Sequence, residues 1–175
     1  YLSSMPIWNR AEPVMEALVQ QVQESCSAAV LDATDIVYVL RVPTQKIMRI
    51  SLGVGSRLPA YCTSLGRLLL ADLEDDEVRA RLEASDIQAL TKHTVTDIEV
   101  LMAKVAQARR QQWCLVNQEL EEGLISVAAP IVDRHGRMVA ALNISGQANR
   151  TSAKVMQETM LPALVDAAKK VSQLL

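Results

Sequence analysis

The spacing of apolar residues predicts three extended helices. Residues 11–26, 95–112 and 150–175 carry apolar side chains three or four positions apart, which is the period of a helix with one buried side. In the last of these, Pro162 is expected to kink the helix, because proline cannot donate the backbone hydrogen bond that a helix interior needs. Two shorter helices are expected, one starting near Thr63 or Ser64 and one over residues 73–84.

The helix predicted over residues 95–112 carries recognisable start signals. Thr96 and Glu99 have the spacing of a capping box, in which the two side chains satisfy free N–H groups of the first turn. Val95 and Val100 are placed to pack on each other as a hydrophobic staple across that turn. We therefore expect Thr96 to be the N-cap of this helix.

Between the helices, the pattern changes to alternating residues or short apolar runs, which is typical of β-strands. Two strands are expected within residues 27–42, joined at 32–35. Two long strands are expected near the C-terminus, joined by a turn in which Gly136 takes a left-handed conformation. These two long strands cover residues 124–132 and 137–145. Two further strands, at residues 46–52 and 114–119, complete a set of six.

This order of elements predicts an α+β domain with a mostly antiparallel sheet and helices on its faces. A chain of 175 residues is long enough for one domain with a substantial core. Because no internal repeat, low-complexity segment or linker interrupts the pattern, residues 1–175 are expected to form a single domain.

The strand predicted over residues 137–145 carries two hydrogen-bonding side chains on one face. Alternation places Asn143 and Ser145 opposite Leu142 and Ile144, and Ser126 on the adjoining strand is positioned to join them. A buried amide needs partners, and small neighbouring residues leave room for a ligand. The alternative is that this face is solvated and carries no site.

Composition and charge narrow the class of protein. Half of the residues are apolar, but only five are aromatic and none is Phe, so the core is mainly aliphatic. The formal net charge is −2, and charges of both signs are spread along the chain, which argues against a nucleic-acid-binding face. The sequence shows neither a signal peptide nor an apolar run near the roughly 20 residues of a membrane span.

Cysteines and histidines offer little support for metal or disulfide chemistry. Cys26, Cys62 and Cys114 have no CxxC spacing, which favours a reducing, cytoplasmic location. His93 and His135 lack partners at metal-ligand spacing, so neither a metal nor a cofactor is expected. Cys62, near a helix start, is a conceivable nucleophile, although cysteines are more often small buried apolar residues.

The stretch GVGSRLPAYCTSLGRLLL, residues 53–70, places two glycines, Arg57 and Pro59 ahead of a helix start. The free N–H groups and positive dipole of a helix start attract anions, and an arginine adds parallel donors suited to a carboxylate. The same residues also fit an ordinary capped helix with Arg57 in a surface ion pair. Without a third glycine and a lysine, the stretch does not match a phosphate-binding loop.

The segment GSRLPAYCTSLGRLLLADL, residues 55–73, and the later VNQELEEGLISVAAPIVDRHGRMVAALNISG, residues 116–146, together resemble the C-terminal effector-binding domain of the IclR family of bacterial transcriptional regulators. The opening YLSSMPIW is similar to the linker that follows the DNA-binding domain in that family. The resemblance implies a GAF-like fold and association into dimers or tetramers. It also implies that DNA is bound only through an N-terminal winged helix-turn-helix domain that is absent from this chain.

The resemblance further implies a ligand pocket between the sheet and the loop-helix of residues 53–70. Ser126, Asn143 and Ser145 would form its polar lining, and the loop from Gly55 to Tyr61 would fold over it with the helix start. The candidate ligand-binding residues are Arg57, Leu58, Tyr61, Thr63, Ser64, Asn117, Ser126, Asn143 and Ser145.

Departures from the commonest family pattern indicate the class of ligand. Residues 58–67 read LPAYCTSLGR where many members read L-P-L-H-x-T-A-x-G-K. The form GSRLPAYCTS resembles the subgroup that regulates aromatic-acid breakdown through the β-ketoadipate pathway and responds to protocatechuate, 4-hydroxybenzoate or an intermediate such as β-ketoadipate. Asn117 stands where Asp is usual, and Ser126 where glyoxylate-sensing members have Cys; both favour neutral hydrogen bonders suited to ring hydroxyls.

The sequence therefore predicts a non-enzymatic sensor domain that binds a small aromatic or dicarboxylic acid and controls genes of aromatic-acid catabolism. Two other classes stay open. An enzyme acting on a small carboxylic acid would need a titratable residue in the pocket, and a structural oligomerisation module would bind no small molecule.

Overall fold

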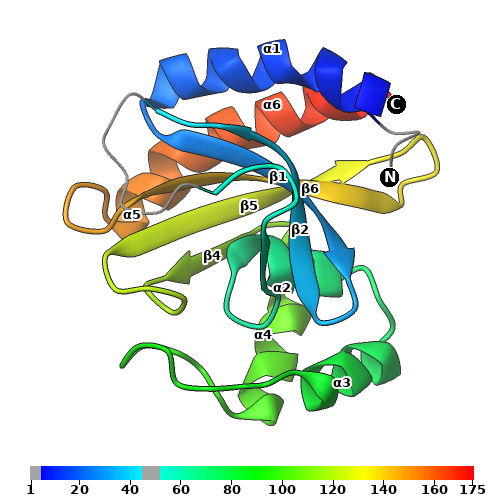
Figure 1. Ribbon diagram of the computed structural model, residues 1–175, viewed down its shortest axis with the longest axis vertical. Coiled ribbons are helices and arrows are strands. Elements are labelled where there is room, and N and C mark those ends of the chain that lie inside the picture. The colour runs from blue at the N-terminus through cyan, green and yellow to red at the C-terminus, as the bar shows by residue number, and fades with distance from the viewer. Residues whose placement is uncertain (1–4, 45–51) are drawn as a thin grey trace.

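Figure 1 shows the computed structural model, which describes residues 5–44 and 52–175. The first elements are α1 (Met5–Val22), β1 (Ser25–Asp32), β2 (Asp35–Val42), β3 (Arg57–Pro59), α2 (Ser64–Leu70) and α3 (Asp75–Ala84). They are followed by α4 (Ile98–Gln111), β4 (Cys114–Asn117), β5 (Leu124–Val132), β6 (Met138–Gln147), α5 (Ala153–Val155), the π-helical turn η2 (Met156–Met160) and α6 (Leu161–Ser172).

One six-stranded sheet organises the domain. Its strand order is β3-β2-β1-β6-β5-β4, and every neighbouring pair is antiparallel. The long helices α1 and α6 lie on one face, and α2 and α4 lie on the other, with α3 packed on α4 (Figure 1). We call these faces the α1 face and the α2 face. The predicted α+β architecture with an antiparallel sheet is confirmed.

The edge strand β3 differs from the prediction. The strand predicted over residues 46–52 lies outside the described residues except for Leu52, which is not in a strand. The strand at this edge is instead β3, which pairs Arg57 with Val37 and ends at Pro59. Because β3 is an edge strand with no neighbour on its outer side, the missing N–H of Pro59 costs no pairing there.

Helix α1 begins and ends earlier than the predicted range of 11–26. It ends at Val22 because Gln23 takes a left-handed conformation with φ of 58°, which terminates an α-helix. Cys26 therefore belongs to β1, and Pro13 lies inside the helix instead of in its first turn.

Two hydrophobic cores lie on opposite faces of the sheet, because successive strand residues point to opposite sides. The α1-face core joins α1 and α6 to strand residues such as Cys26, Leu142 and Ile144. The α2-face core joins α2, α3 and α4 to strand residues such as Ala128 and Ala141. Both faces of the central strands are thus covered.

Helix α2 is buried on every side, whereas its periodicity predicts one buried side with Leu65, Leu68 and Leu69. The close packing depends on Gly66, where an added Cβ would lie 2.3 Å from both the Cα and the carbonyl oxygen of Ala60. The missing side chain lets the preceding turn run directly against the helix backbone.

Helix α4 starts one residue later than predicted. Asp97, not Thr96, is the N-cap, and its carboxylate accepts a hydrogen bond from the Val100 N–H at 3.1 Å. Glu99 pairs instead with Arg79 on α3 at 2.7 Å. Val100 is 45% exposed, so the predicted staple does not form.

The C-terminal helix is continuous but changes geometry ahead of Pro162. The Leu161 N–H donates to the Met156 carbonyl five residues back, which closes the π-helical turn η2. Because Pro162 has no N–H to donate, the chain enters α6 from this wider turn. Within the described residues, no helix is both long and apolar enough to span a lipid bilayer.

Candidate functional site

A polar strip crosses the centre of the sheet on the α2 face. Asn143 on β6 lies opposite Ser27 on β1 and is 3% exposed. Its Oδ1 accepts a hydrogen bond from the Ser27 N–H at 2.9 Å, and its Nδ2 donates to Ser145 Oγ at 3.2 Å. The alternative in which Asn143 is solvated is therefore wrong: its amide is buried, with a partner at each end.

The strip continues across β5 to the start of α2. Ser126 lies opposite Ser145 in the sheet, and its Oγ is 2.7 Å from Ser64 Oγ. Three of the predicted residues therefore meet where the first turn of α2 rests on the sheet. Both Ser126 and Ser145 remain partly exposed.

In the other direction the strip includes Ser27 and Arg41, neither of which was among the predicted site residues. Arg41 on β2 lies opposite Ser27, and its Nη1 donates to Ser27 Oγ at 3.1 Å. Tyr38 is buried in the α2-face core, opposite Ala29 in the next row of the sheet. Strict alternation would place Tyr38 and Arg41 on opposite faces, because they are three positions apart. The shift in the β1–β2 pairing between Ala28 and Ala29 brings both to the α2 face. We define the polar strip as Ser27, Arg41, Ser64, Ser126, Asn143 and Ser145.

Thr63 is the N-cap of α2, as the prediction of a helix start near Thr63 or Ser64 requires. Its hydroxyl accepts a hydrogen bond from the Gly66 N–H at 3.1 Å and donates to the Pro59 carbonyl at 2.9 Å. The donor and one acceptor position of the hydroxyl are used within the turn, so Thr63 fixes the start of α2 beside Ser64.

A buried ion pair fixes the other side of α2. Arg67 is 2% exposed and binds Glu119, which follows β4, through two parallel hydrogen bonds, one of them 2.9 Å from Nη1 to Oε2. The Arg67 Nε donates to the Tyr61 carbonyl at 2.9 Å, and Glu119 also accepts from the Val95 N–H at 3.0 Å. Thus one residue of α2 links the preceding turn, the end of β4 and the segment before α4.

Arg57 lies in a surface ion pair, which is the second of the two placements that its position in the sequence allowed. Its guanidinium forms ion pairs with Asp32 at 2.8 Å and Asp35 at 3.1 Å, and its side chain is 47% exposed. These two aspartates bracket the β1–β2 turn, and both hold Arg57 through hydrogen bonds that raise its pKa. The Arg57 guanidinium therefore pairs with surface carboxylates and does not lie beside the start of α2.

Asn117, Leu58 and the loop from Gly55 to Tyr61 also lie apart from the polar strip. Asn117 is exposed and lies opposite Ile125, whose side chain enters the α1-face core; it is therefore on the other side of the sheet from Ser126. Leu58 is an apolar residue packed against the α2-face core. Residues 55–59 hydrogen-bond along β2 and extend the sheet at its edge instead of folding over its face.

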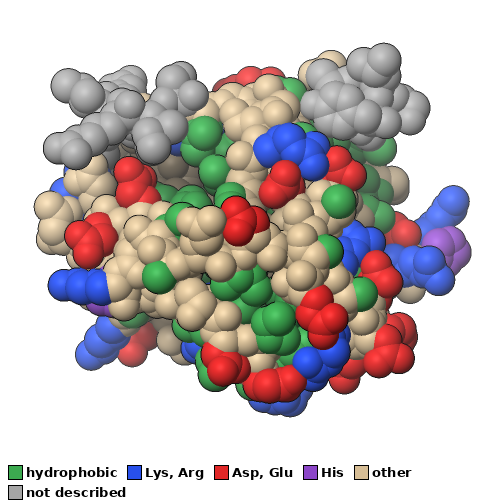
Figure 2. Space-filling view, turned by 60° about the horizontal axis from the view of Figure 1, so that its bottom comes forward, with side chains coloured by type: hydrophobic (Ala, Val, Ile, Leu, Met, Phe, Trp, Pro, Cys, Tyr) green, Lys and Arg blue, Asp and Glu red, His purple; other side chains and the backbone are tan. Residues whose placement is uncertain are grey.

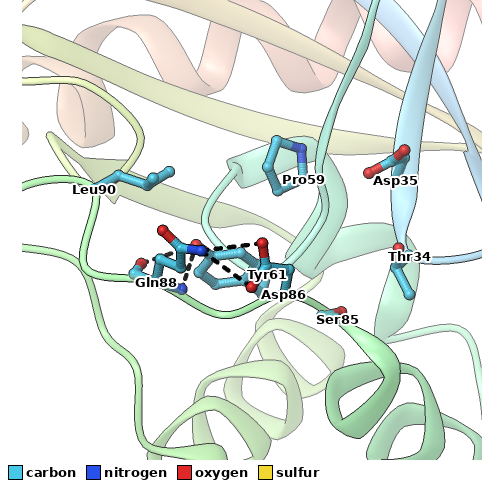
Figure 3. Close-up of a pocket in the computed structure, with 8 residues that line it drawn as sticks. All are labelled: Thr34, Asp35, Pro59, Tyr61, Ser85, Asp86, Gln88 and Leu90. Atoms are coloured by element: carbon cyan, nitrogen blue, oxygen red, sulfur yellow. Dashed lines mark hydrogen bonds between the residues drawn. The ribbon is translucent and has the colours of Figure 1, made fainter.

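Tyr61 points into a separate cleft of about 260 Å³ between the β1–β2 turn, β3 and the segment after α3 (Figure 3). Its hydroxyl donates to the Gln88 carbonyl at 2.9 Å and accepts from the Gln88 N–H at 3.1 Å. The Gln88 side-chain amide is in turn held by Asp86 at 3.1 Å. These polar groups satisfy one another, so Tyr61 anchors the segment after α3.

The cysteines are unsuited to nucleophilic catalysis. All three are free and buried. Burial raises the pKa of Cys62 to about 11 and that of Cys114 to about 11, and it also raises the pKa of Cys26. The thiolate, which is the reactive form, is therefore scarce near neutral pH. Among the described residues no cluster of His, Cys, Asp and Glu could hold a metal ion.

Charged side chains of both signs lie on the molecular surface. On the face shown in Figure 2, acidic and basic side chains are intermingled, and apolar side chains appear as small separate patches.

Comparison with known proteins places this arrangement in context. Residues 1–173 match the family described as bacterial transcriptional regulator IclR C-terminal. The Pca regulon regulatory protein of Pseudomonas putida is 42% identical over 170 residues, which is 97% of this chain and 58% of that protein. The chain thus spans little more than half the length of this relative.

Two solved structures share the fold. The PobR inducer-binding domain from Acinetobacter, a double mutant in complex with 3-hydroxybenzoic acid, has a TM-score of 0.88 and 30% identity, covering 95% of this chain and 98% of that one. An IclR homologue from Microbacterium hydrocarbonoxydans in complex with 4-hydroxybenzoate has a TM-score of 0.86 and 26% identity, covering 98% and 68%.

Proposed function

Because this chain belongs to the IclR family of bacterial transcriptional regulators, we propose that it is the domain that senses a small aromatic acid for a regulator of aromatic-acid catabolism. The observation that carries the proposal is the polar strip, where neutral hydrogen-bonding groups lie together on a sheet face under α2. Two relatives of the same fold are complexes with hydroxybenzoates, and a third regulates a Pca regulon.

The proposed effector site is the part of the strip formed by Ser64, Ser126, Asn143 and Ser145. The hydroxyl and amide groups of these residues can donate hydrogen bonds to, or accept them from, a hydroxyl on an aromatic ring. Glyoxylate has no ring and therefore no ring hydroxyl to meet them. The relatives are transcriptional regulators and not enzymes. The proposed function accordingly requires binding and release of the acid, with no turnover.

Regulation requires the acid to favour one arrangement of the whole protein. A ligand shifts an equilibrium between two arrangements only if it binds them with different affinity. We propose that the complete protein couples this domain to a DNA-binding domain outside the 175 residues, and that copies of the chain associate as dimers or tetramers. The mixed charge of the face shown in Figure 2 is consistent with DNA contact through another part of the protein.

Ligand binding is tested by a thermal-shift screen of the chain against protocatechuate, 3- and 4-hydroxybenzoate, β-ketoadipate, glyoxylate and pyruvate. An acid at about a hundred times its Kd adds about 2.7 kcal/mol to the free energy of unfolding. We expect the hydroxybenzoates or protocatechuate to raise the midpoint temperature most. If none of the six acids shifts the midpoint, the structural oligomerisation module is favoured instead.

Replacing Asn143 by leucine should weaken binding of the acid at least about tenfold, because one lost hydrogen bond contributes about 1.4 kcal/mol or more at a buried site. The variant should also be destabilised by about 1–3 kcal/mol, since the buried Ser27 N–H loses its acceptor. Isothermal titration measures the affinity, and urea unfolding measures the stability.

The matched control is Ile144→Val on the same strand. Ile144 faces the α1-face core, so this change should cost about 0.5–1.5 kcal/mol of stability while leaving the affinity for the acid unchanged. If Asn143→Leu and Ile144→Val bind the acid equally well, Asn143 does not belong to the effector site.

A further inference from the structure

The turn between β5 and β6 carries basic side chains on a fixed backbone. Asp133 Oδ1 accepts hydrogen bonds from the His135 N–H at 2.8 Å and the Arg137 N–H at 3.0 Å, and Gly136 is left-handed with φ of 79°. In Figure 1 this turn, coloured yellow, projects beyond the right-hand edge of the sheet. Its exposed side chains include Arg134, His135 and Arg137. We call these three residues the basic arm.

A cleft of about 450 Å³ lies next to the basic arm. It is formed by residues after α2, the start of α3 and the end of α4, together with Met138, which follows Arg137 directly in the chain. Leu73 and Met138 are partly buried and give the cleft an apolar part. The arm and the cleft are therefore neighbours on the surface of one molecule.

The cleft is acidic. Its lining includes the carboxylates of Asp72, Glu74, Asp75 and Asp76. Arg109 donates to Asp75 at 2.9 Å and gives its other donors to two backbone carbonyls at 2.8 and 2.9 Å. Glu74 is the N-cap of α3, but its side chain does not cap the helix. Three of the four carboxylates thus have no ion pair with any residue that the structure describes.

The charges of the arm and the cleft do not compensate each other within one chain. Among the described residues, neither Arg134 nor Arg137 forms an ion pair with a carboxylate of the cleft. An arginine fork matches a carboxylate in a two-pronged geometry. Because the turn is already fixed by Asp133 and Gly136, little backbone freedom would be lost when the arm binds.

We propose that the basic arm of one copy of the chain binds in the acidic cleft of a second copy. A surface that carries a positive arm beside a negative cleft is complementary to itself, so a two-fold axis between arm and cleft forms both contacts at once. This inference rests on the association of copies that the proposed function includes, and it names the surface that associates. A second copy is the occupant because the chain itself supplies both charges.

The first test reverses the charge of each side separately. The arm variant carries Arg134→Glu and Arg137→Glu, and the cleft variant carries Asp72→Lys and Glu74→Lys. Each variant would bring like charges together in a pair of identical copies, so its self-association should weaken at least about 100-fold. Sedimentation velocity over a range of concentrations measures the association, which should also weaken at high ionic strength.

Mixing the two variants is the decisive experiment. In the mixed pair an acidic arm meets a basic cleft and a basic arm meets an acidic cleft, so association should return to about the level of the unaltered chain. Damage to the fold cannot produce this recovery, and circular dichroism establishes that each variant is folded. Lys92→Glu with Lys154→Glu is the matched control: both lysines are exposed and lie outside the arm and the cleft, so association should not change.

The inference and the proposed function fail in different ways. If both variants associate as strongly as the unaltered chain, or if the mixture does not recover, the inference is wrong and the proposed association stands on another surface. If the unaltered chain stays monomeric at every concentration, the inference is wrong together with the proposed association. The sensing function is tested apart from both, because the arm lies outside the polar strip. Titration of the arm variant with 4-hydroxybenzoate should therefore give the affinity of the unaltered chain.

Discussion

Replacing Glu119 by glutamine should lower the free energy of unfolding by about 3–5 kcal/mol, because the change leaves the buried Arg67 guanidinium without a counter-charge. Arg67 is 2% exposed and Glu119 is 7% exposed, so water cannot take the place of the carboxylate. Glu119 also accepts the Val95 N–H, and the loss should therefore loosen the segment before α4. Urea unfolding followed by circular dichroism measures the effect.

The exposed pair of Arg79 and Glu99 provides the control. Its side chains are 43% and 69% exposed, so Glu99→Gln should leave the unfolding midpoint almost unchanged, because solvent and salt screen such pairs. Equal effects of Glu119→Gln and Glu99→Gln would contradict the assignment of a buried pair.

A double replacement separates the loss of the pair from the burial of an unpaired charge. Arg67→Met combined with Glu119→Leu removes both charges together and puts apolar groups in their place. Replacing both members of a buried ion pair by apolar residues is often neutral or stabilising, whereas removing one member is costly. The double variant should therefore be more stable than Glu119→Gln. If it is less stable, the stabilisation comes from the hydrogen bond that Arg67 donates to the Tyr61 carbonyl and the one that Glu119 accepts from the Val95 N–H.

Replacing Gly66 by alanine should destabilise the chain by about 3 kcal/mol or more, because the new Cβ would overlap backbone atoms. It would lie 2.3 Å from the Ala60 Cα and carbonyl oxygen and 2.6 Å from its carbonyl carbon. Backbone cannot rotate away as a flexible side chain can, so α2 or the turn before it must move. The higher helix propensity of alanine, worth about 1 kcal/mol, is too small to offset this.

The same displacement should weaken acid binding, since Ser64 belongs to α2 and contacts Ser126 in the strip. Gly53→Ala is the matched control: a Cβ there has no neighbour within 4 Å, and the stability should change by no more than about 0.5 kcal/mol. Urea unfolding and titration with 4-hydroxybenzoate are the two measurements. If Gly66→Ala unfolds at the same urea concentration as Gly53→Ala, α2 does not pack as tightly on Ala60 as described.

Local patterns were sufficient to predict most of the helices and strands. Helix α2 starts where its Thr63 cap signal predicts, and β5 and β6 follow the apolar runs around the turn at Gly136. The short strand β3 could not be predicted, because three residues carry no period and its pairing with β2 is a long-range contact. The predicted N-cap of α4 was wrong by one residue. Thr96 and Asp97 are both good N-cap residues, and only the surrounding structure selects between them.

In the candidate site, too, positions set by the pattern within one strand could be predicted, and positions set by pairing between strands could not. Alternation along β6 was enough to place Asn143 and Ser145 on one face. Asn117 was misplaced, because the pairing register of β4 puts Val116, not Asn117, beside Ser126. Arg41 was missed because its place in the strip depends on the register of β2 against β1 and of β1 against β6. The partner of Arg67, 52 positions away, has no local signal at all.

The three buried thiols make the two cores separately observable. Cys26 lies in the α1-face core, and Cys62 and Cys114 lie in the α2-face core. A protected thiol is alkylated only when its surroundings open, so its labelling rate reports the free energy of that local opening. An acid that binds under α2 and stabilises only the α2-face core would slow the labelling of Cys62 and Cys114. The labelling rate of Cys26 would stay unchanged and serve as an internal reference. The labelling rates of these three cysteines therefore distinguish local stabilisation of one core from stabilisation of the whole domain.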